Sequence, residues 1–89
     1  MPRMVITHSV VDVDKWLLGK QERSDQVNSM GVTDVVDYVA QDGSNHIAIS
    51  GDAGDPAVVL AALASPPDEM KAAMDKHGVL PPLTVYIEK

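Results

Sequence analysis

The histidine at position 8 is the residue of this chain best suited to proton transfer. It follows the β-branched run MVIT and precedes SVV, so it interrupts a stretch that is otherwise suited to burial in a strand. An imidazole titrates near neutral pH, so His8 is a candidate general base for a phenol or an activated C–H group. The alternative is a half-buried strand histidine that forms only a structural hydrogen bond.

His46 opens a second β-rich run, HIAIS, which we expect to pair with the run around His8. If His8 lies opposite His46, the two rings form a cross-strand pair suited to proton transfer or to a metal. If Ile6 instead shares a face with Ile47 and Ile49, His8 joins that face and His46 points away, because a slip of one residue turns every side chain over. The second register is preferred, since it keeps the isoleucines together.

His77 lies in the expected last helical turn before Gly78, where a partly cationic ring interacts favourably with the negative end of the helix. A structural role is the stronger interpretation there. The three histidines lack the close paired spacing and the cysteine partners of zinc sites. We therefore expect no metal and no other cofactor.

Four side chains are candidate ligand-binding groups: Trp16, Lys20, His46 and Tyr86. Trp16 could stack on a planar ligand, although a lone tryptophan is more often a core anchor. Lys20 and Arg23 occupy the polar centre of the first expected helix, where an inward-pointing cation would suit a carboxylate or enolate oxygen. The orientation of Lys20 stays open, whereas Arg23 is expected to be solvated. Tyr86 and Tyr38 fall in strands, where a phenol could orient a substrate oxygen or simply pack across the sheet.

The composition excludes several classes of protein. The chain has 89 residues, no Cys, no Phe, one Trp, two Tyr and a net charge of −6. It therefore lacks the basic and aromatic surface of a nucleic-acid reader, and an anionic membrane surface is an unfavourable partner. No apolar stretch reaches the roughly 18 residues of a membrane helix, and the N-terminus has no signal-peptide core, so the cytoplasm is the expected location. A core this small, without disulfides, favours a homodimer.

Turn and capping residues divide the chain into alternating elements. Asp12 and Asp55-Pro56 begin helices, Asp42-Gly43 marks a hairpin, and Ser65 is expected to cap a restarted helix that Gly78 ends. The expected order is strand 4–10, helix 13–30, strand 32–40, strand 46–50, helix 56–64, helix 66–77 and strand 83–89.

This β-α-β-β-α-β order, with right-handed crossovers, predicts an α+β ferredoxin-like domain over residues 1–89. The sheet order becomes 4-1-3-2 with all neighbours antiparallel, and both helical segments cover one face. The other face still carries apolar side chains. A second copy of the chain is the simplest cover for it.

The segments THSVVDVDKW, DGSNHIAIS and SPPDEMKAAMDKHGVLPPLTVYIEK resemble small uncharacterised bacterial members of the dimeric α/β-barrel superfamily. Such relatives show an H-x-V-x-D-x-D-x-W start and a Ser-Pro helix that ends in Gly-Val. The resemblance implies a homodimer whose two sheets face each other, with a ligand cleft between each sheet and its helices. The superfamily includes cofactor-free monooxygenases, polyketide-cyclase-like proteins, haem-handling enzymes and stress-response proteins. No catalytic motif of an enzymatic branch matches residue by residue.

Three functions follow as hypotheses. The first is a homodimer of unassigned role that binds a small organic molecule between sheet and helices. The second is a cofactor-free cyclase-like or monooxygenase-like enzyme, with His8 as the base and Trp16 and Tyr86 shaping the cleft. The third is a non-catalytic interaction or stress-response module that docks through acidic outer helices. The scarcity of aromatic residues argues against a tailored pocket for a polycyclic substrate.

Overall fold

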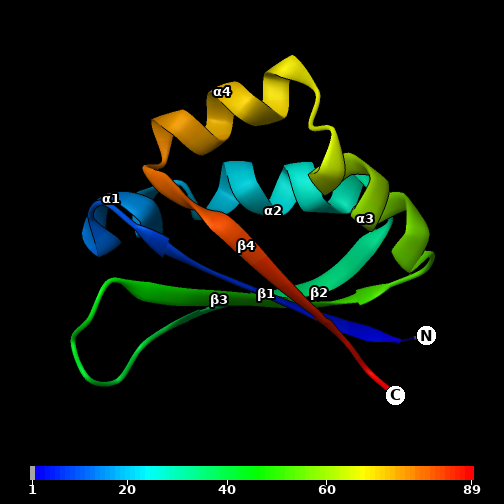
Figure 1. The fold of residues 1–89 in the computed structure, drawn as a ribbon, viewed down its shortest axis with the longest axis horizontal. Coiled ribbons are helices and arrows are strands. Elements are labelled where there is room, and N and C mark those ends of the chain that lie inside the picture. Colours follow the sequence, from blue (N-terminus) through cyan, green and yellow to red (C-terminus); the bar gives the residue numbers. More distant parts are fainter. Residues whose placement is uncertain (1) are drawn as a thin grey trace.

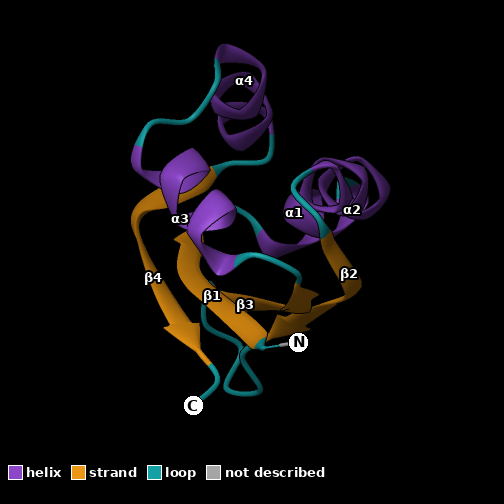
Figure 2. Ribbon diagram, turned by 90° about the vertical axis from the view of Figure 1, so that its right-hand side faces the viewer, coloured by secondary structure: helices purple, strands orange, loops and turns teal. Residues whose placement is uncertain are grey.

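Four antiparallel strands form a sheet, and four helices cover one of its faces (Figures 1 and 2). The computed structural model describes residues 2–89. The strand order β2-β3-β1-β4 confirms the predicted ferredoxin-like arrangement. The strands are β1 (Arg3–Val10), β2 (Val32–Val39), β3 (His46–Ala53) and β4 (Val79–Ile87). The helices are α1 (Val13–Leu18), α2 (Lys20–Ser29), α3 (Pro56–Ala64) and α4 (Asp68–Lys76). Within residues 2–89, no helix is long and apolar enough to span a bilayer.

Strand register separates the two faces of the sheet. Ile6 pairs with Ile49 and His8 with Ile47, so these side chains share the helix-covered face. His46 pairs with Ser9 and lies on the opposite face, which we call the open face. The register that keeps the isoleucines together is therefore confirmed. The open face carries three rows of directly paired residues: Val36–Ser50–Val5–Tyr86, Tyr38–Ala48–Thr7–Thr84 and His46–Ser9–Leu80.

The core between sheet and helices consists of two clusters. One contains Met4, Val32, Ala53 and Val59, with side chains such as Leu63 and Val85 packed against it. The other contains Val10, Trp16, Ile47 and Ile49. Trp16 is completely buried, so the one tryptophan joins α1 to the sheet. Burial of this large ring makes it a main contributor to the second cluster.

The single helix predicted over residues 13–30 is wrong, because Gly19 divides it into α1 and α2. The start was predicted correctly, since Asp12 accepts hydrogen bonds from the N–H groups of Asp14 and Lys15. The division lies at a position with no room for a side chain. The imidazole of His77 lies directly against Gly19, and a Cβ at this position would collide with the ring.

The prediction that Ser65 caps the restarted helix is also wrong. Ser65 instead ends α3, where its N–H donates to the carbonyl of Ala61, and α4 begins at Asp68 after Pro67 without a side-chain cap. Two consecutive prolines favour extended backbone here and delay the helix. The start of α3 was predicted correctly, because Asp55 accepts a hydrogen bond from the N–H of Ala57.

The third and fourth strands are longer than predicted. Strand β3 continues to Ala53, and β4 already begins at Val79 and includes the cis Pro81-Pro82 bond. Between Thr7 and Ser9 the pairing with β4 shifts, so that the single residue His8 faces the three residues 81–83. Neither proline has an N–H to donate to β1. The ladder is therefore interrupted beside His8.

Candidate functional site

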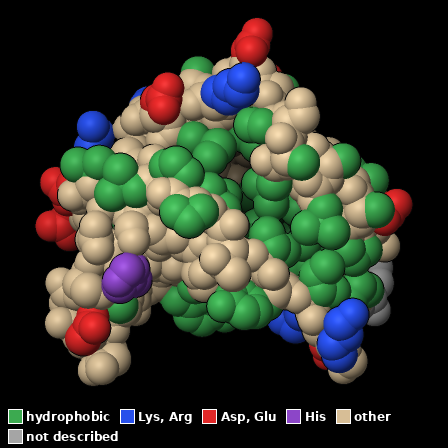
Figure 3. All heavy atoms as spheres, in the orientation of Figure 1, with side chains coloured by type: hydrophobic (Ala, Val, Ile, Leu, Met, Phe, Trp, Pro, Cys, Tyr) green, Lys and Arg blue, Asp and Glu red, His purple; other side chains and the backbone are tan. Residues whose placement is uncertain are grey.

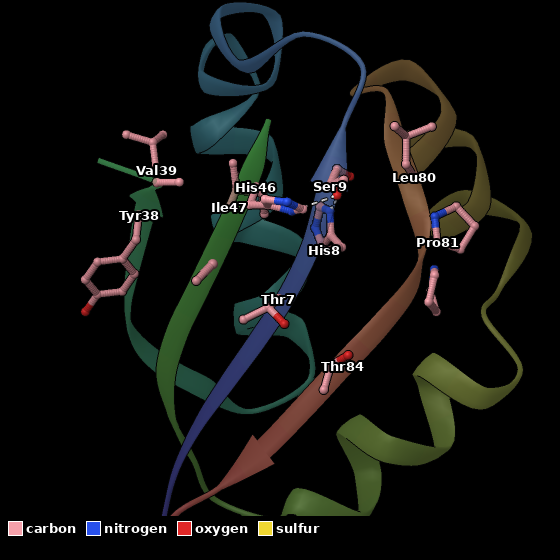
Figure 4. Close-up of a pocket in the computed structure, with 13 residues that line it drawn as sticks. Thr7, His8, Ser9, Tyr38, Val39, His46, Ile47, Leu80, Pro81 and Thr84 are labelled. Atoms are coloured by element: carbon pink, nitrogen blue, oxygen red, sulfur yellow. Dashed lines mark hydrogen bonds between the residues drawn. The ribbon is translucent and has the colours of Figure 1, made fainter. Parts of the chain in front are cut away.

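One concave surface lies on the open face, at the end of the sheet where β4 bulges. We call it the sheet concavity; it measures about 520 Å³. Figure 4 shows its lining on β1, β2, β3 and β4, with Tyr38 and Val39 on one side and Leu80 and Pro81 on the other. Its polar members are Thr7, His8, Ser9, His46 and Thr84.

His8 lines this concavity although its side chain belongs to the helix-covered face. The residue is 8% exposed, and it lies opposite the interrupted part of the β1–β4 ladder. His8 Nδ1 donates to the carbonyl of Ser9 at 2.9 Å, which leaves Nε2 as the nitrogen with a free lone pair. Burial lowers the pKa of His8 below its ordinary value, the nearby charge of Arg23 lowers it further, and the Ser9 carbonyl acts in the opposite direction. The ring is therefore favoured in its neutral, proton-accepting form.

His46 lines the same concavity, and its side chain lies on the open face. Its Nδ1 lies 3.0 Å from Ser9 Oγ, and the dashed line in Figure 4 marks this contact. His46 is exposed, whereas His8 is buried. The two rings are close in the sheet but do not form the direct cross-strand pair of the rejected register, because each has a different opposite residue.

Beneath His8, the core contains a buried charge pair. Trp16 meets the His8 ring edge-on, with ring centroids 6.4 Å apart and planes at 84°. The Arg23 guanidinium lies 3.8 Å above the Trp16 ring, and its Nη2 donates to Asp37 at 2.8 Å. Arg23 Nη1 also donates to the carbonyl of Trp16. These stacked and hydrogen-bonded groups fill the space between α2 and the sheet at this end.

The other candidate residues are spread over the surface. Lys20 is exposed on α2, and Tyr86 is 58% exposed on the open face opposite Val5. The expectation that Arg23 is solvated is wrong, because it is 7% exposed and pairs with Asp37. Of the predicted site residues, His8 and His46 meet in the sheet concavity and Trp16 lies below His8. The structure does not bring Lys20 or Tyr86 to this group.

A second concave surface, the helix cleft, separates α2 from α3 and α4 and measures about 590 Å³. These helices stand apart above the sheet in Figure 2, and the space-filling view shows a hollow lined by hydrophobic side chains below α4 (Figure 3). The apolar part of its lining is Met30, Ala62, Pro67, Met70, Ala72 and Ala73. The polar part is Glu22, Asp25, Gln26, Ser29, Glu69 and Lys76.

One end of the helix cleft is closed by contacts between α2 and the end of α4. Glu22 Oε2 lies 3.2 Å from Lys76 Nζ and 3.4 Å from His77 Nε2. His77 is 6% exposed and packs on Gly19. The hydrogen bond from Lys76 and the charges of Lys76 and His77 lower the pKa of Glu22 below its ordinary value. The helix cleft is therefore closed at the end where Glu22 contacts Lys76 and His77.

The sequence reasoning missed the residues of the helix cleft and the partner of Arg23. One signal for the partner was available, because Asp37 alternates with Val35 and Val39 and so falls on the apolar side of β2. A carboxylate at such a position requires a cation. The cleft had no comparable signal, since its lining comes from three helices whose separation the sequence does not specify.

Comparison with known proteins supports the fold. No family model matches the chain, and no curated protein matches it. A solved antibiotic biosynthesis monooxygenase is similar at a TM-score of 0.68 and 13% identity, covering 100% of this chain and 97% of that one. A dimeric ferredoxin-like protein from an uncultured marine organism gives a TM-score of 0.61 at 6% identity, covering 100% and 93%. Protein Atu4242 from Agrobacterium tumefaciens gives 0.65 at 12%, covering 100% and 92%. The chain therefore has the ferredoxin-like α+β fold of these proteins.

Proposed function

We propose that the protein is a homodimer that binds a small organic molecule in the helix cleft, on the helix-covered side of the sheet. The observation that carries this proposal is the cleft itself. Its volume of about 590 Å³ falls within the range of small-molecule sites, and it combines apolar walls with a few polar groups at the rim. Met30 and Met70 add flexible side chains that adapt to an irregular ligand.

The open face supports the dimer. Val36, Tyr38 and Tyr86 lie on it and are 38%, 46% and 58% exposed. The face is only partly apolar, because Thr7, Ser9 and Thr84 share the rows of paired residues. A second copy offers the same mixture, so apolar side chains would meet apolar side chains while hydroxyl groups pair around them. One of the solved proteins of this fold is named as dimeric, which agrees with this arrangement.

The ligand is tested by native mass spectrometry of the protein purified from its own host. We expect a dimer mass and a bound small molecule that is lost on substitution Ala72→Trp. Ala72 lines the cleft and is exposed, so a large side chain there would fill the cleft without entering the core. A molecule that Ala72→Trp retains, or a wild-type protein without one, would contradict binding in the cleft.

The dimer is tested by sedimentation of the double variant Val36→Glu/Tyr86→Glu at micromolar concentration. Charges at two exposed positions of the open face should produce a folded monomer. The matched control is Leu18→Glu, because Leu18 is 88% exposed but belongs to α1. If both variants remain dimeric, the open face is not the interface.

A second candidate is a cofactor-free enzyme with His8 as general base, acting at the sheet concavity. The supporting observation is the His8 side chain: burial lowers its pKa, Nδ1 is engaged by the Ser9 carbonyl while Nε2 is free, and the residue lines a concavity of about 520 Å³. Turnover of an electron-rich phenol, followed by oxygen uptake and product analysis, tests it. His8→Gln should abolish turnover without changing the dimer mass. Equal turnover in the variant and the wild type would remove His8 from any catalytic role.

A further inference from the structure

The charges around the helix cleft are mostly negative. Glu22 and Asp25 stand on α2, and Glu69 stands in the first turn of α4 across the cleft. Lys76 is the cationic group among the lining residues. It is already engaged, because its Nζ lies 3.2 Å from Glu22 Oε2. One acid is thus neutralised by the one cation of the lining.

The other two acids of the lining, Asp25 and Glu69, have no cationic partner among the described residues. Within residues 2–89, neither Asp25 nor Glu69 lies within 4.0 Å of a Lys or Arg nitrogen. Among residues 2–89, the side chain of Asp25 accepts its hydrogen bond from the neutral amide of Gln21, at 2.9 Å. Glu69 lies near the positive end of the α4 dipole, which stabilises a carboxylate but does not cancel a full charge. The rim therefore presents two uncompensated carboxylates on facing walls.

The interior of the helix cleft is apolar, in contrast to its acidic rim. Met30, Met70 and Ala73 present methyl, thioether and methylene surface. A ligand that satisfies both regions needs an apolar body and a positive end. An anionic ligand would meet Asp25 and Glu69 as like charges at the rim. The net charge of −6 on the chain also attracts cations over longer distances.

We propose that the helix cleft selects an organic cation, an amine with an apolar body, and excludes carboxylates of the same shape. This inference rests on the proposed function and specifies the ligand class of the same site. The ammonium group would lie at the rim between Asp25 and Glu69, while the apolar body would contact the methionines beneath. The predicted role of Lys20 as a carboxylate-binding cation has no part in this arrangement, because Lys20 is exposed and does not line the cleft.

Three probes of nearly equal shape test the inference: naphthylmethylamine, naphthylmethanol and naphthoate. Binding to the full chain is followed by probe fluorescence and confirmed by calorimetry at low ionic strength. We expect the amine to bind at least about tenfold more tightly than naphthoate, with the alcohol between them. Raising the salt concentration to about 0.5 M should reduce this preference, because the rim is exposed to solvent.

Two variants distinguish the effect of the rim carboxylates on binding from the effect of the net charge of the chain. In Asp25→Asn/Glu69→Gln the preference for the amine should fall to within about threefold. Asp68→Asn is the matched control, because Asp68 precedes Glu69 in the same helical turn but does not line the cleft. It should retain the preference. If the double variant keeps the full preference, the rim carboxylates do not select the ligand and the inference is overturned.

The outcomes also distinguish the inference from the function on which it rests. If all three probes bind equally and all are lost in Ala72→Trp, the cleft is a ligand site and only the charge selection is wrong. If no probe binds in a manner that Ala72→Trp abolishes, both the proposed site and its selectivity fail. Circular dichroism of each variant establishes that the fold is retained.

Discussion

Arg23 and Arg3 each pair with aspartate, but they lie on opposite faces of the same sheet. Arg23 extends from α2 to Asp37 of β2 at 2.8 Å, and the two side chains are 8% and 5% exposed. Arg3 pairs on the open face with Asp52 at 2.9 Å and with Asp34 at 3.1 Å. Its side chain is 37% exposed, and that of Asp34 is 68% exposed.

The difference in burial changes what each pair does for the protein. Water screens the charges of Arg3 and its partners, so their loss leaves solvated groups behind. Arg23 and Asp37 have lost most of their water, and either one alone would be an uncompensated charge in the core. Removal of one partner is therefore expected to be costly on the covered face and to cost little on the open face.

The largest expected effect is that of Asp37→Asn, which leaves the buried Arg23 without its carboxylate. We expect the free energy of unfolding to fall by about 3 to 5 kcal/mol, as found for broken buried pairs. Urea denaturation followed by circular dichroism measures it. The matched control is Asp34→Asn, which removes one exposed partner of Arg3 and should leave the urea midpoint nearly unchanged. Equal midpoints for the two variants would contradict the contrast between the faces.

A smaller effect is expected for Gly19→Ala, which tests the packing of His77, after α4, against the junction of α1 and α2. The added methyl group would collide with the imidazole of His77, so we expect a loss of about 1 to 3 kcal/mol in the free energy of unfolding. Gly54→Ala is the control, because the nearest atom to its Cβ would be at 3.6 Å, an ordinary contact. Adding Gly19→Ala to a His77→Ala background should cost little, because the colliding ring is gone. An undiminished cost in that background would contradict the steric explanation.

The smallest effect is a pH dependence that distinguishes the histidine of the covered face from that of the open face. Burial lowers the pKa of His8 in the folded state, whereas in the unfolded chain it returns to about 6.5. The folded state therefore binds fewer protons, and the stability contributed by neutral His8 is complete above pH 6.5 and is lost as the pH falls below it. Urea midpoints measured from pH 8 to pH 5 should fall in the wild type and fall less in His8→Gln. His46→Gln, on the open face, should retain the slope that His8 produces; an identical slope in His8→Gln would refute the assignment.

Much of the fold could be predicted because local patterns and sheet geometry agree. A register that keeps Ile6, Ile47 and Ile49 on one face was preferred over the alternative that pairs His8 with His46, and the structure has the preferred register. Asp12 and Asp55 marked helix starts through their short side chains. Such features depend on neighbouring residues and need no knowledge of the rest of the chain.

The candidate site was predicted only in part. His8 was predicted from its residue type. Its place beside the sheet concavity was not, because the irregular pairing of β1 with residues 81–83 of β4 could not be predicted from the sequence. Arg23 was expected in solvent because α2 is polar on most of its surface. Its burial follows from Trp16 of the neighbouring helix α1 and from Asp37 of β2. These side chains meet Arg23 only when α1, α2 and β2 have packed together.

The sequence by itself determined the order of strands and helices and their antiparallel arrangement, and it favoured the register that keeps Ile6, Ile47 and Ile49 on one face. These depend on alternation, capping groups and turn residues, all of which act over a few positions. Only the tertiary structure decided the division of the first helix at Gly19, the burial of the Arg23–Asp37 pair and the separation of α2 from α4 that forms the helix cleft. Each of these depends on the distance between elements, which is set by the volumes of side chains that meet from distant parts of the chain.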